Sequence, residues 1–422
     1  MTRCIVCEST RVELFLDLGA TALANKFLTR EELNRPEPAY PLQVGFCHSC
    51  THIQLMDHVP PSEMFMDYLY ISSASDTLTA HLKELSDVVV ERYRLGPSHL
   101  VMDIGCNDGT LVRGFARHGV KTLGVDPAEN LARLAARDGI ERYVGFFNAQ
   151  TAWEIVSRWG QASAITATNT FPHIPALRDF VEGITHALAP GGVFVIETHY
   201  LLDLLEQGAF DTIYHEHVSY WALRPMTRLF ERVGMQVVEV ERLPIHHGQL
   251  RVFVQRKGEG RVQPSVADLV ALERARGLER LETYHQFARA TLANKQRLRD
   301  TLSRLKAQGK RIAGYGAPAK GNTLLSFLEL GPDLIDYIAD KSPLKQGRYT
   351  PGTHIPVVPP QRLLEDQPDY VVLLAWNFAD EVLAQQAEYR RRGGAFILPL
   401  PEVRFIGGTE TFSTTITITE AA

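Results

Sequence analysis

The sequence lacks several features, and each absence excludes a class of protein. None of its 422 residues lie in a stretch that approaches the roughly 20 apolar residues of a membrane-spanning helix. The first ten residues, MTRCIVCEST, contain no apolar segment of the kind found in a secretory signal. Positive charge is not in excess, because the formal net charge is −5. The protein therefore has no overall positive field to attract a nucleic acid backbone. We therefore expect a cytoplasmic protein that binds neither membranes nor nucleic acid. As a separate expectation, we take it to be a monomer.

The composition is that of an ordinary globular protein. Hydrophobic residues make up 45% of the chain and charged residues 22%, which is enough apolar material for large buried cores. A single core rarely grows to this chain length, so the sequence predicts two or three domains.

Cysteine is scarce, but four of the five residues form two matched pairs. These are Cys4-x-x-Cys7 and Cys47-x-x-Cys50, and Cys106 lies apart. A spacing of two lets both thiolates of a pair bind one metal, and two such pairs complete a closed four-cysteine site. Because a closed site leaves no open position for catalysis, we predict a structural zinc. Disulfides or a redox pair are the alternative, which a reducing compartment disfavours.

The stretch LVMDIGCNDGTLVRGFARHGVKTLGVD, residues 100–126, predicts strand, glycine turn, helix and strand. It lacks the dinucleotide-binding pattern G-x-G-x-x-G, because Asn107 stands where the second glycine is required. The flanking carboxylates of Asp103 and Asp108 would also repel a pyrophosphate, whereas they would attract a cationic ligand. Asp126 ends the next apolar run, where a carboxylate can accept both hydroxyls of a ribose.

A cation joined to a ribose describes S-adenosylmethionine (SAM). The stretch resembles the class I SAM-dependent methyltransferase fold. A bare Rossmann-like turn with solvated acids is the alternative. The predicted cofactor-binding residues are Asp103, Gly105, Asn107, Gly109, Asp126 and Asn169.

Polar residues follow two further predicted strands. SAITATN (163–169) ends at Asn169, and GGVFVIETHY (191–200) ends with Glu197, His199 and Tyr200. Open α/β sheets bind ligands at the carboxyl ends of their strands, so we expect these side chains and His173 at the ligand edge.

The stretch YHEHVSYW, residues 214–221, concentrates titratable and aromatic side chains. It can form a buried hydrogen-bond network, a metal site or an acid/base cluster. Metal ligation is disfavoured, because His215 and His217 have no obvious third ligand. An acid/base cluster is favoured, because a cofactor that supplies an electrophile still needs an activated nucleophile.

Nine segments together resemble one known family, the sugar C-methyltransferases of deoxysugar biosynthesis, which act on nucleotide-linked 4-keto hexoses. They cover the chain from residue 4 to about 405 in the order of the paired CxxC motifs, YLYISSAS, DIGCNDGTL, TNTFPHI, YHEH, HHGQLR, GYGAPAKGNT, DKSPLKQGRYTPGTHIPV and AWNFADE. The resemblance implies an α/β protein with a zinc-binding domain (1–66), a SAM domain (67–262), a C-terminal Rossmann-like domain (263–410) and a tail (411–422). It also implies methylation of a ring carbon, usually C3, beside the keto group of a sugar that we expect to be linked to dTDP.

The family's catalytic residues match Tyr214, Glu216 and His217, with His173, Tyr68 and Tyr70 in support. Imidazole has an unperturbed pKa of about 6.5, which suits a base near neutral pH. We therefore predict His217 as the base with Glu216 orienting its ring, and Tyr214 as the alternative base.

The C-terminal part predicts a nucleotide-binding fold. Residues 265–308 read as a helical stretch with a narrow apolar stripe made by Leu278, Leu281, Tyr284, Ala288 and Leu292. RIAGYGAPAKGNTLL then predicts strand, turn and helix, with Lys320 in the first helical turn as a diphosphate ligand; a solvated surface lysine is the alternative. The predicted substrate-binding residues are Glu197, His246, Arg251, Tyr315, Lys320, Asn322, Lys345 and Arg348.

Two departures from the family's pattern concern the sugar. His247 stands where the family often has a glycine, and Thr198-His199 where it more often has a proline before the tyrosine. Another small-molecule O- or N-methyltransferase and a catalytically silent nucleotide-sugar-binding homologue remain the rival functions.

Overall fold

A computed structural model describes residues 2–68, 70–132, 139–245 and 248–407. The chain divides into two compact units. The first unit comprises Met1–Asn25 with Ala39–Arg289, and the second comprises Lys26–Pro38 with Ala290–Ala422. None of the helices in these described ranges is long and apolar enough to cross a membrane.

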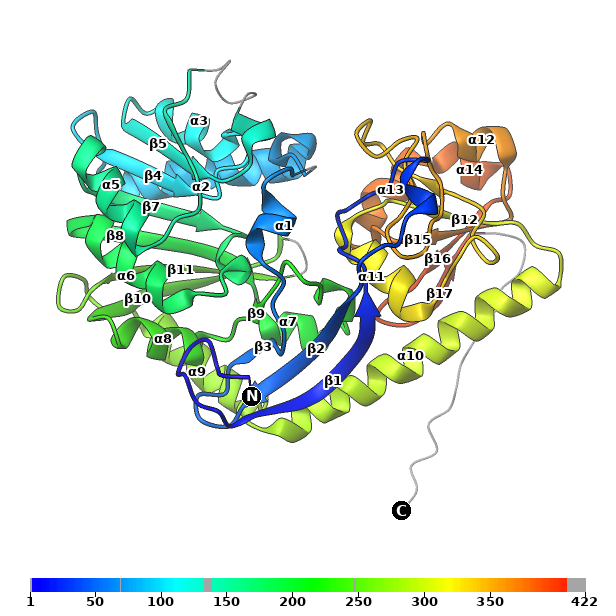
Figure 1. Ribbon diagram of the computed structural model, residues 1–422, viewed down its shortest axis with the longest axis horizontal. Coiled ribbons are helices and arrows are strands. Elements are labelled where there is room, and N and C mark those ends of the chain that lie inside the picture. The colour runs from blue at the N-terminus through cyan, green and yellow to red at the C-terminus, as the bar shows by residue number, and fades with distance from the viewer. Residues whose placement is uncertain (1, 69, 133–138, 246–247, 408–422) are drawn as a thin grey trace. The chain divides into compact units, whose positions relative to one another are not determined.

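The described part of the first unit contains a seven-stranded sheet in the order β10-β11-β8-β7-β4-β5-β6 (Figure 1). β8, β7, β4, β5 and β6 are parallel, whereas β11 runs antiparallel to both β8 and β10. The strands are β4 Leu100–Ile104, β5 Lys121–Asp126, β6 Arg142–Val144, β7 Ala162–Thr168, β8 Leu188–His199, β10 Met235–Leu243 and β11 Gln249–Arg256. The predicted alternation of strands and helices is confirmed, and the polar strand ends gather at one edge.

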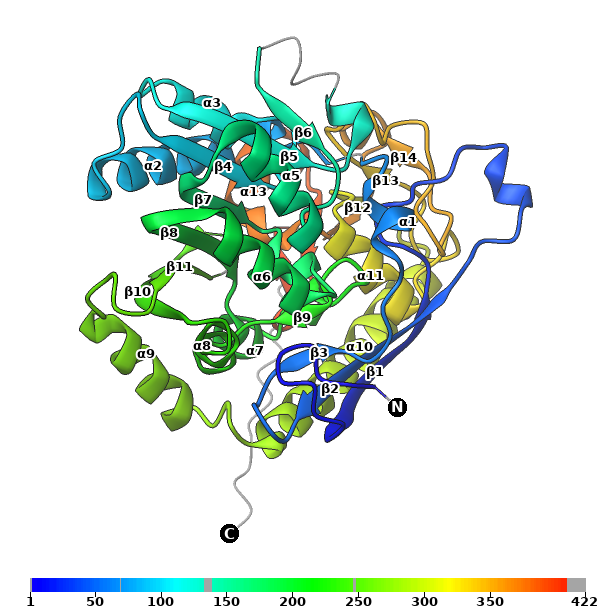
Figure 2. The ribbon, with the colours of Figure 1, turned by 60° about the vertical axis from the view of Figure 1, so that its left-hand side comes forward.

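Helices cover both faces of this sheet, as alternating residues of β8 show. Val193 and Val195 join the apolar cluster made with α2 (Asp76–Arg92) and α3 (Thr110–Ala116). Phe194, between them, instead contacts Phe180 of α6 (Leu177–Ala187) and Phe230 of α8 (Leu223–Glu231). α5 (Ala149–Trp159) lies beside α6 (Figure 2). The shorter helices are α1 Pro61–Phe65 and α7 Leu201–Glu206, with 3-10 turns at Ser72–Ala74, Phe171–His173 and Phe210–Thr212.

A smaller sheet of the first unit joins the N-terminal segment to the region of YHEHVSYW. Its order is β1-β2-β3-β9, with β1 Val12–Thr21, β2 Tyr40–Cys47, β3 Ile53–Leu55 and β9 Ser219–Tyr220. β9 pairs antiparallel with β3 through Tyr220 and Ile53. The segment that carries Tyr214 to His217 is therefore anchored directly to the N-terminal strands.

The predicted helical stretch 265–308 is interrupted. α9 (Pro264–Ala275) ends before Gly277, and α10 (Leu281–Ala307) begins after Leu278. Gly277 has a φ of +75°, a conformation that residues with a β-carbon disfavour. Leu278 is buried outside the helices, and Leu292 is 53% exposed, so these two residues do not belong to one helical stripe. The predicted stripe was therefore wrong at its two ends, because Gly277 separates Leu278 from α10 and Leu292 is exposed on that helix, whereas Tyr284 and Ala288 between them are buried.

The second unit contains a six-stranded sheet among its described residues, in the order β14-β13-β12-β15-β16-β17. Only the pairing of β17 with β16 is antiparallel in that sheet. The strands are β12 Ile312–Tyr315, β13 Ile338–Ala339, β14 Val357–Val358, β15 Tyr370–Leu373, β16 Ala395–Leu398 and β17 Arg404–Ile406. The helices are α11 Ala319–Leu328, α12 Arg362–Asp366, α13 Ala379–Gln385 and α14 Ala387–Arg391, with a 3-10 turn at Trp376–Phe378. This is a doubly wound order, whose direction reverses between β12 and β15, the place where such sheets bind ligands.

Residues 26–38, which we call the arm, belong to the second unit although they lie between β1 and β2 in sequence. Leu28 and Tyr349 exchange two backbone hydrogen bonds of 3.0 and 2.9 Å. Glu37 accepts from the Gly352 backbone N–H at 2.8 Å and from His354 Nε2 at 3.0 Å. The arm also contains a 3-10 turn at Glu32–Asn34 and packs against the connection between β13 and β14.

Candidate active site

The four paired cysteines converge at the N-terminus of the first unit. Cys4 Sγ lies 3.5 Å from Cys50 Sγ, Cys7 Sγ lies 3.5 Å from Cys47 Sγ, and all four sulfurs lie within 4.8 Å of one another. Disulfide sulfurs would be about 2 Å apart, whereas four thiolates around one zinc lie roughly 3.8 Å apart. The four cysteines therefore form a zinc site, as predicted.

Two arginines, one in α8 and one directly after it, bind the two cysteine turns. Arg232 donates to the Val6 carbonyl at 2.9 Å, and Arg228 donates to the Ser49 carbonyl at 2.7 Å. Both carbonyls belong to the two cysteine turns. The metal thus stabilises a region that also holds β9 in place.

The predicted cofactor turn follows β4 and depends on two glycines with positive φ. Gly105 has a φ of +74°, and a β-carbon there would collide with the Thr170 side chain. Gly109, with a φ of +82°, precedes α3, and a β-carbon there would collide with Ile140. Both positions require glycine, for conformation and for space.

Asp126 is joined to this turn. Its Oδ2 accepts from the Asn107 backbone N–H at 2.8 Å, and its Oδ1 accepts from the Ala128 N–H at 2.8 Å. Arg142 Nη2 lies 3.4 Å from Oδ1. Burial raises the pKa of Asp126, and the hydrogen bonds and Arg142 oppose that rise. The carboxylate ends β5 beside the turn, which is the place predicted for a ribose ligand.

Asp103 lies deeper, at the end of β4. Thr166 Oγ1 donates to its Oδ1 at 2.6 Å, and burial raises the pKa of Asp103 to about 7. Asn169, after β7, has a φ of +53° and accepts from Gln249 Nε2 at 2.7 Å. The carboxylates of Asp103 and Asp126, beside the turn, fit a ligand with a positive charge.

The segment YLYISS, residues 68–73, connects the cofactor turn to the YHEH cluster. Asn107 donates to the Tyr70 carbonyl at 3.0 Å and accepts from the Ser72 N–H at 2.9 Å. Tyr68 O–H donates to Glu216 Oε2 at 2.8 Å. Tyr70 is 43% exposed, with its ring 6.3 Å from that of Tyr68. One short segment therefore holds residues of both predicted sites.

Tyr214 and His217 form a hydrogen-bonded pair. His217 Nδ1 lies 2.8 Å from the Thr212 carbonyl, which can only accept, so Nδ1 carries the proton of the neutral ring. Nε2 is then the acceptor, and Tyr214 O–H donates to it at 2.9 Å. Burial, followed by the charge of Glu216, raises the pKa of Tyr214 well above its usual value. When the ring is neutral, the pair is therefore a protonated tyrosine that donates to the imidazole Nε2.

Two further imidazoles flank His217. The ring of His173 stacks 5.2 Å from that of His217, and the ring of His199 lies 4.6 Å from it. Burial lowers the pKa of His173 to about 4, so His173 is neutral at neutral pH. Its Nε2 is buried and has no hydrogen-bond partner among the described residues. That atom is available to a ligand.

The hydrogen-bond partners of Glu216 differ from those predicted. The imidazole of His217 is oriented by the Thr212 carbonyl, where we expected a pairing with Glu216. Glu216 Oε1 accepts from Asn25 Nδ2 at 2.6 Å, and Oε2 accepts from Tyr68. The physical reason is a turn at 214–217, in which the His217 N–H donates to the Tyr214 carbonyl and places residues 214 and 217 together.

Two predicted substrate ligands, Glu197 and Arg251, bind each other. They lie opposite one another on β8 and β11, and Arg251 Nε donates to Glu197 Oε1 at 2.6 Å. Arg251 also pairs with Glu84 at 2.7 Å, and His81 Nε2 lies 2.7 Å from Glu197 Oε2. Both residues are buried, so the structure assigns them to the packing of the sheet. The predicted ligand His246 lies outside the described residues.

The remaining predicted substrate ligands lie in the second unit. Tyr315 ends β12, and Lys320 and Asn322 lie in the first turns of α11, which no side chain caps. Lys345 donates to the Ala317 carbonyl at 2.7 Å, and its Nζ lies 5.1 Å from the centroid of the Phe27 ring.

Arg348 and Asp340 complete this edge of the second unit. Arg348 donates to the Phe27 carbonyl at 3.3 Å, so both predicted cations of the connection touch the arm. Asp340 accepts from the Ala317 N–H at 2.6 Å and thereby fixes the turn before α11.

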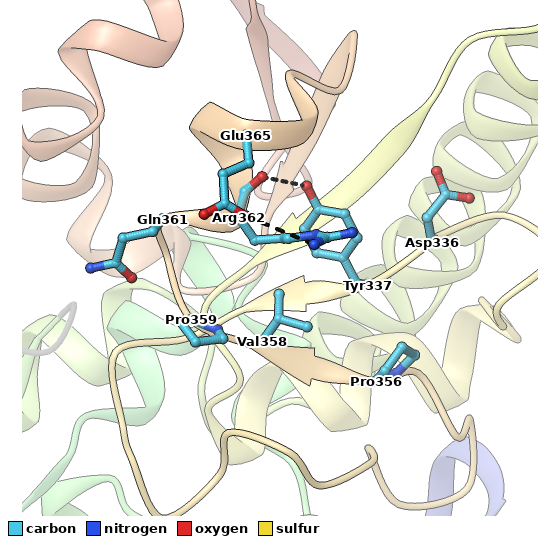
Figure 3. A pocket seen from close by; sticks show the side chains of 8 residues that line it. All are labelled: Asp336, Tyr337, Pro356, Val358, Pro359, Gln361, Arg362 and Glu365. Atoms are coloured by element: carbon cyan, nitrogen blue, oxygen red, sulfur yellow. Dashed lines mark hydrogen bonds and ion pairs between the residues drawn. The ribbon is translucent and has the colours of Figure 1, made fainter.

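A cavity of about 520 Å³ also lies in the second unit (Figure 3). It is lined by Asp336, Tyr337 and Pro356, which precede β13 and β14, and by residues up to Glu365 of α12. Figure 3 shows the Tyr337 hydroxyl pointing to the Arg362 carbonyl, 3.4 Å away. The cavity lies beside the edge strand β14 and contains none of the predicted site residues, so we assign it no ligand.

Sequence reasoning missed Asn25, Thr212 and Arg142. Asn25 is far from Glu216 in sequence, and Thr212 acts through its carbonyl, so neither gave a signal. Arg142 could have been suspected, because an arginine in the short strand beside Asp126 must bury its charge.

Comparison with known proteins agrees with this organisation. Family models match residues 4–65 as a zinc binding domain, 78–240 as a methyltransferase domain and 244–401 as a C-methyltransferase C-terminal domain. The chain is 37% identical over 409 residues to "C-methyltransferase NovU" of Streptomyces niveus, covering 97% of both chains. A ubiquinone biosynthesis O-methyltransferase of Methylobacterium sp. (strain 4-46) is 25% identical over 172 residues, 36% of this chain and 67% of the relative. The plantazolicin methyltransferase BpumL, solved with SAH, has a TM-score of 0.34 and 12% identity over 42% of this chain and 82% of its own. The chain belongs to the C-methyltransferase family of SAM-dependent enzymes, with an N-terminal zinc-binding domain and a C-methyltransferase C-terminal domain.

Proposed function

We propose that this C-methyltransferase acts on a nucleotide-linked 4-keto-deoxysugar and methylates the carbon next to the ketone, C3. The observation that carries the proposal is the Tyr214–His217 pair beside the unpartnered Nε2 of His173. A carbon beside a ketone becomes a nucleophile when a base removes its proton and a donor stabilises the enolate oxygen. The cluster contains one group for each task.

His217 is the proposed base. The Thr212 carbonyl holds its proton on Nδ1, which leaves the lone pair on Nε2. When Nε2 receives the proton from the sugar carbon, it becomes a donor to the Tyr214 oxygen. The Tyr214 O–H is then released to donate to the enolate oxygen. The raised pKa of Tyr214 supports this order, because a phenol that stays protonated cannot act as the base and keeps its O–H as a donor.

His173 is the proposed first ligand of the keto oxygen. Its ring is fixed between Phe65, 5.2 Å away, and His217. A buried Nε2 without a partner is costly in the free protein, and a substrate carbonyl would remove that cost. Glu216 holds Tyr68 and Asn25 in place beside the same cluster. Bound SAM supplies the electrophilic methyl group.

The nucleotide is assigned to the second unit. The uncapped start of α11, with Lys320 in its first turn and Lys345 fixed to the Ala317 carbonyl, offers N–H donors and positive charge suited to a diphosphate. We take dTDP as the nucleotide, and the protein as a monomer that binds a small molecule.

A panel of nucleotide-linked sugars tests the proposal. Purified protein with SAM is offered dTDP- and UDP-linked 4-keto-6-deoxyhexoses together with the matching 4-hydroxy sugars. We expect a product heavier by one methyl group only from the 4-keto sugars, with NMR placing the new carbon–carbon bond at C3. A methyl group on oxygen, or equal turnover of the 4-hydroxy sugars, would overturn it.

A further inference from the structure

Arg142 of β6 is a buried charge that the proposed reaction does not use. Its side chain is only 5% exposed. Nη1 donates to the Asn107 carbonyl at 2.8 Å, and Nη2 lies 3.4 Å from Asp126 Oδ1. Nε and Nη2 are buried and have no hydrogen-bond partner among the described residues. Unpaired N–H groups on a buried guanidinium are costly, so the geometry indicates a ligand oxygen beside them.

Asp126 supplies the acceptors that complement these donors. Each of its two oxygens already accepts one backbone N–H, from Asn107 and from Ala128. A carboxylate has about four lone-pair positions, so each oxygen can accept one more hydrogen bond. A vicinal diol has two O–H donors and two oxygen acceptors. The Asp126–Arg142 pair therefore matches a ribose diol with both kinds of partner.

The charges around Asp126 show why a cation is needed there. Burial raises its pKa, and Arg142 is the charged neighbour that lowers it. The other titratable or charged groups at this turn are Asp103, Asp108, the neutral thiol of Cys106 and Arg113, whose Nη2 lies 3.9 Å from Asp108 Oδ1. Arg142 is thus the charge that offsets the burial of Asp126, and Asp103 and Asp126 act on each other as like charges.

We propose that Arg142 is a positioning residue of the cofactor site: it keeps Asp126 ionised against the turn and donates from Nη2 to the ribose diol. This inference rests on the proposed ribose role of Asp126, and not on the identity of the sugar substrate. It assigns to β6 a specificity for ribose that the glycine turn alone does not provide.

The test is the pH dependence of S-adenosylhomocysteine binding, measured by calorimetry from pH 5.5 to 8.5. Arg142→Met should bind about 10- to 100-fold more weakly near pH 6.5, the range for lost hydrogen bonds to a charged group. The sign follows from the pKa of Asp126: without Arg142 that pKa rises further, so the acceptor is protonated at low pH and recovers as pH rises. The affinity of Arg142→Met should therefore rise toward pH 8.5 and approach that of Arg142→Lys, since both variants lose the donor to the diol.

Two variants control this measurement. Arg142→Lys keeps the charge, so it should retain the wild-type pH profile with a moderate, uniform loss of affinity. Arg158→Met removes an arginine of α5 that is 69% exposed and should change neither affinity nor profile. The probe is the same throughout, so its own titration cancels between variants. Far-UV circular dichroism verifies that each variant is folded.

A double-mutant comparison separates Asp126 from Asp103, whose pKa Arg142 also lowers. In an Asp126→Asn background, Arg142→Met should lose only the donor to the diol, so it should cost no more than Arg142→Lys costs in the wild type and should add no pH dependence. A pH-independent loss in Arg142→Met, or a full loss in the double variant, overturns the proposal. If Arg142→Met does not fold, the comparison of wild type with Arg142→Lys decides, because a shifted profile there is equally contradictory. Binding is measured without a sugar, so failure of the proposed sugar specificity would leave this result intact.

Discussion

At the scale of single residues, the tautomer of His217 decides the division of labour in the proposed active site. A sequence reader sees Tyr214, Glu216 and His217 as neighbours and cannot tell which two will pair. On an extended strand Tyr214 and Glu216 would share one face. The turn at 214–217 instead brings residues 214 and 217 together, and Glu216 turns to Asn25 and Tyr68. The members of the cluster were predictable, because their chemistry is visible, whereas their partners depend on a local turn.

Replacement of the pair separates proton removal from methyl transfer. His217→Asn should lose both solvent deuterium exchange at the sugar carbon and methylation by roughly 10²–10⁴-fold, the usual contribution of a positioned base. Tyr214→Phe should retain exchange, because it leaves His217 Nε2 available, and should slow methylation. Exchange can be followed by NMR with the cofactor omitted. Wild-type exchange in His217→Asn would transfer the role of base to another residue.

Asp103 gives a prediction about stability and pH. Burial raises its pKa from 3.8 to about 7, so between these values the folded protein holds a proton that the unfolded chain has lost. The contribution of Asp103 to the free energy of unfolding is therefore fully present below about pH 4, where the carboxyl group is protonated in both states. It is lost as pH rises to about 7, because the folded protein must then bury a charge or hold a proton. Asp103→Asn, which keeps an acceptor for Thr166, should be more stable than wild type at pH 7.5 by at most about 4 kcal/mol, and equally stable at pH 4. Urea unfolding at both pH values checks this, and a stability difference of the same size at both would refute the assignment.

At the scale of elements, two short segments contact several of the predicted site residues. Within residues 68–73, Tyr70 is bonded to Asn107 of the cofactor turn, and Tyr68 is bonded to Glu216 of the YHEH cluster. The arm, residues 26–38, holds Lys345 and Arg348. Strands and helices were predictable from their apolar periodicity, and α6 shows the pattern, because Leu177, Phe180, Val181 and Ile184 are all buried. Neither short segment has such a periodicity, so only their tertiary contacts reveal where they bind.

The arm should influence nucleotide binding through Phe27. Its ring lies under the ammonium group of Lys345, a contact typically worth 0.5–2 kcal/mol. Phe27→Ala should therefore weaken dTDP binding to the full-length protein by about 2- to 30-fold and leave S-adenosylhomocysteine binding unchanged. Calorimetry with each ligand measures both. Leu344→Ala, in the same connection but 42% exposed, serves as the control. Equal losses for both ligands in Phe27→Ala would indicate general destabilisation instead.

At the scale of the whole molecule, the order of the segments predicted the architecture, and one feature escaped. The alternation of apolar strands with helices predicted both α/β sheets, and the cysteine spacing predicted the zinc site. The assignment of residues 26–38 to the second unit, between two strands of the first, could not be read from the chain. A chain excursion of this kind leaves no composition signal, because the two backbone hydrogen bonds between Leu28 and Tyr349 join residues more than 300 positions apart.

The zinc site provides a prediction about the whole molecule. Removal of the metal by chelation should lower the unfolding temperature of the first unit by roughly 10 °C or more, because structural zinc contributes directly to folding. Elemental analysis of the untreated protein should give about one zinc per chain. Cys47→Ser should reproduce the loss, whereas Cys106→Ser, whose thiol lies outside the cluster, should retain the metal.

The loss of zinc should also separate the two ligand sites of the first unit. β9 follows the YHEH cluster and pairs with β3, which lies directly after the second cysteine pair, so the positions of Tyr214 and His217 depend on strands that the metal holds. The seven-stranded sheet with the cofactor turn contains none of these N-terminal strands. Metal-free protein at a temperature where it remains folded should therefore bind S-adenosylhomocysteine with nearly unchanged affinity and lose deuterium exchange at the sugar carbon. If exchange persists at the wild-type rate after the zinc has been removed, the N-terminal strands do not position the catalytic pair.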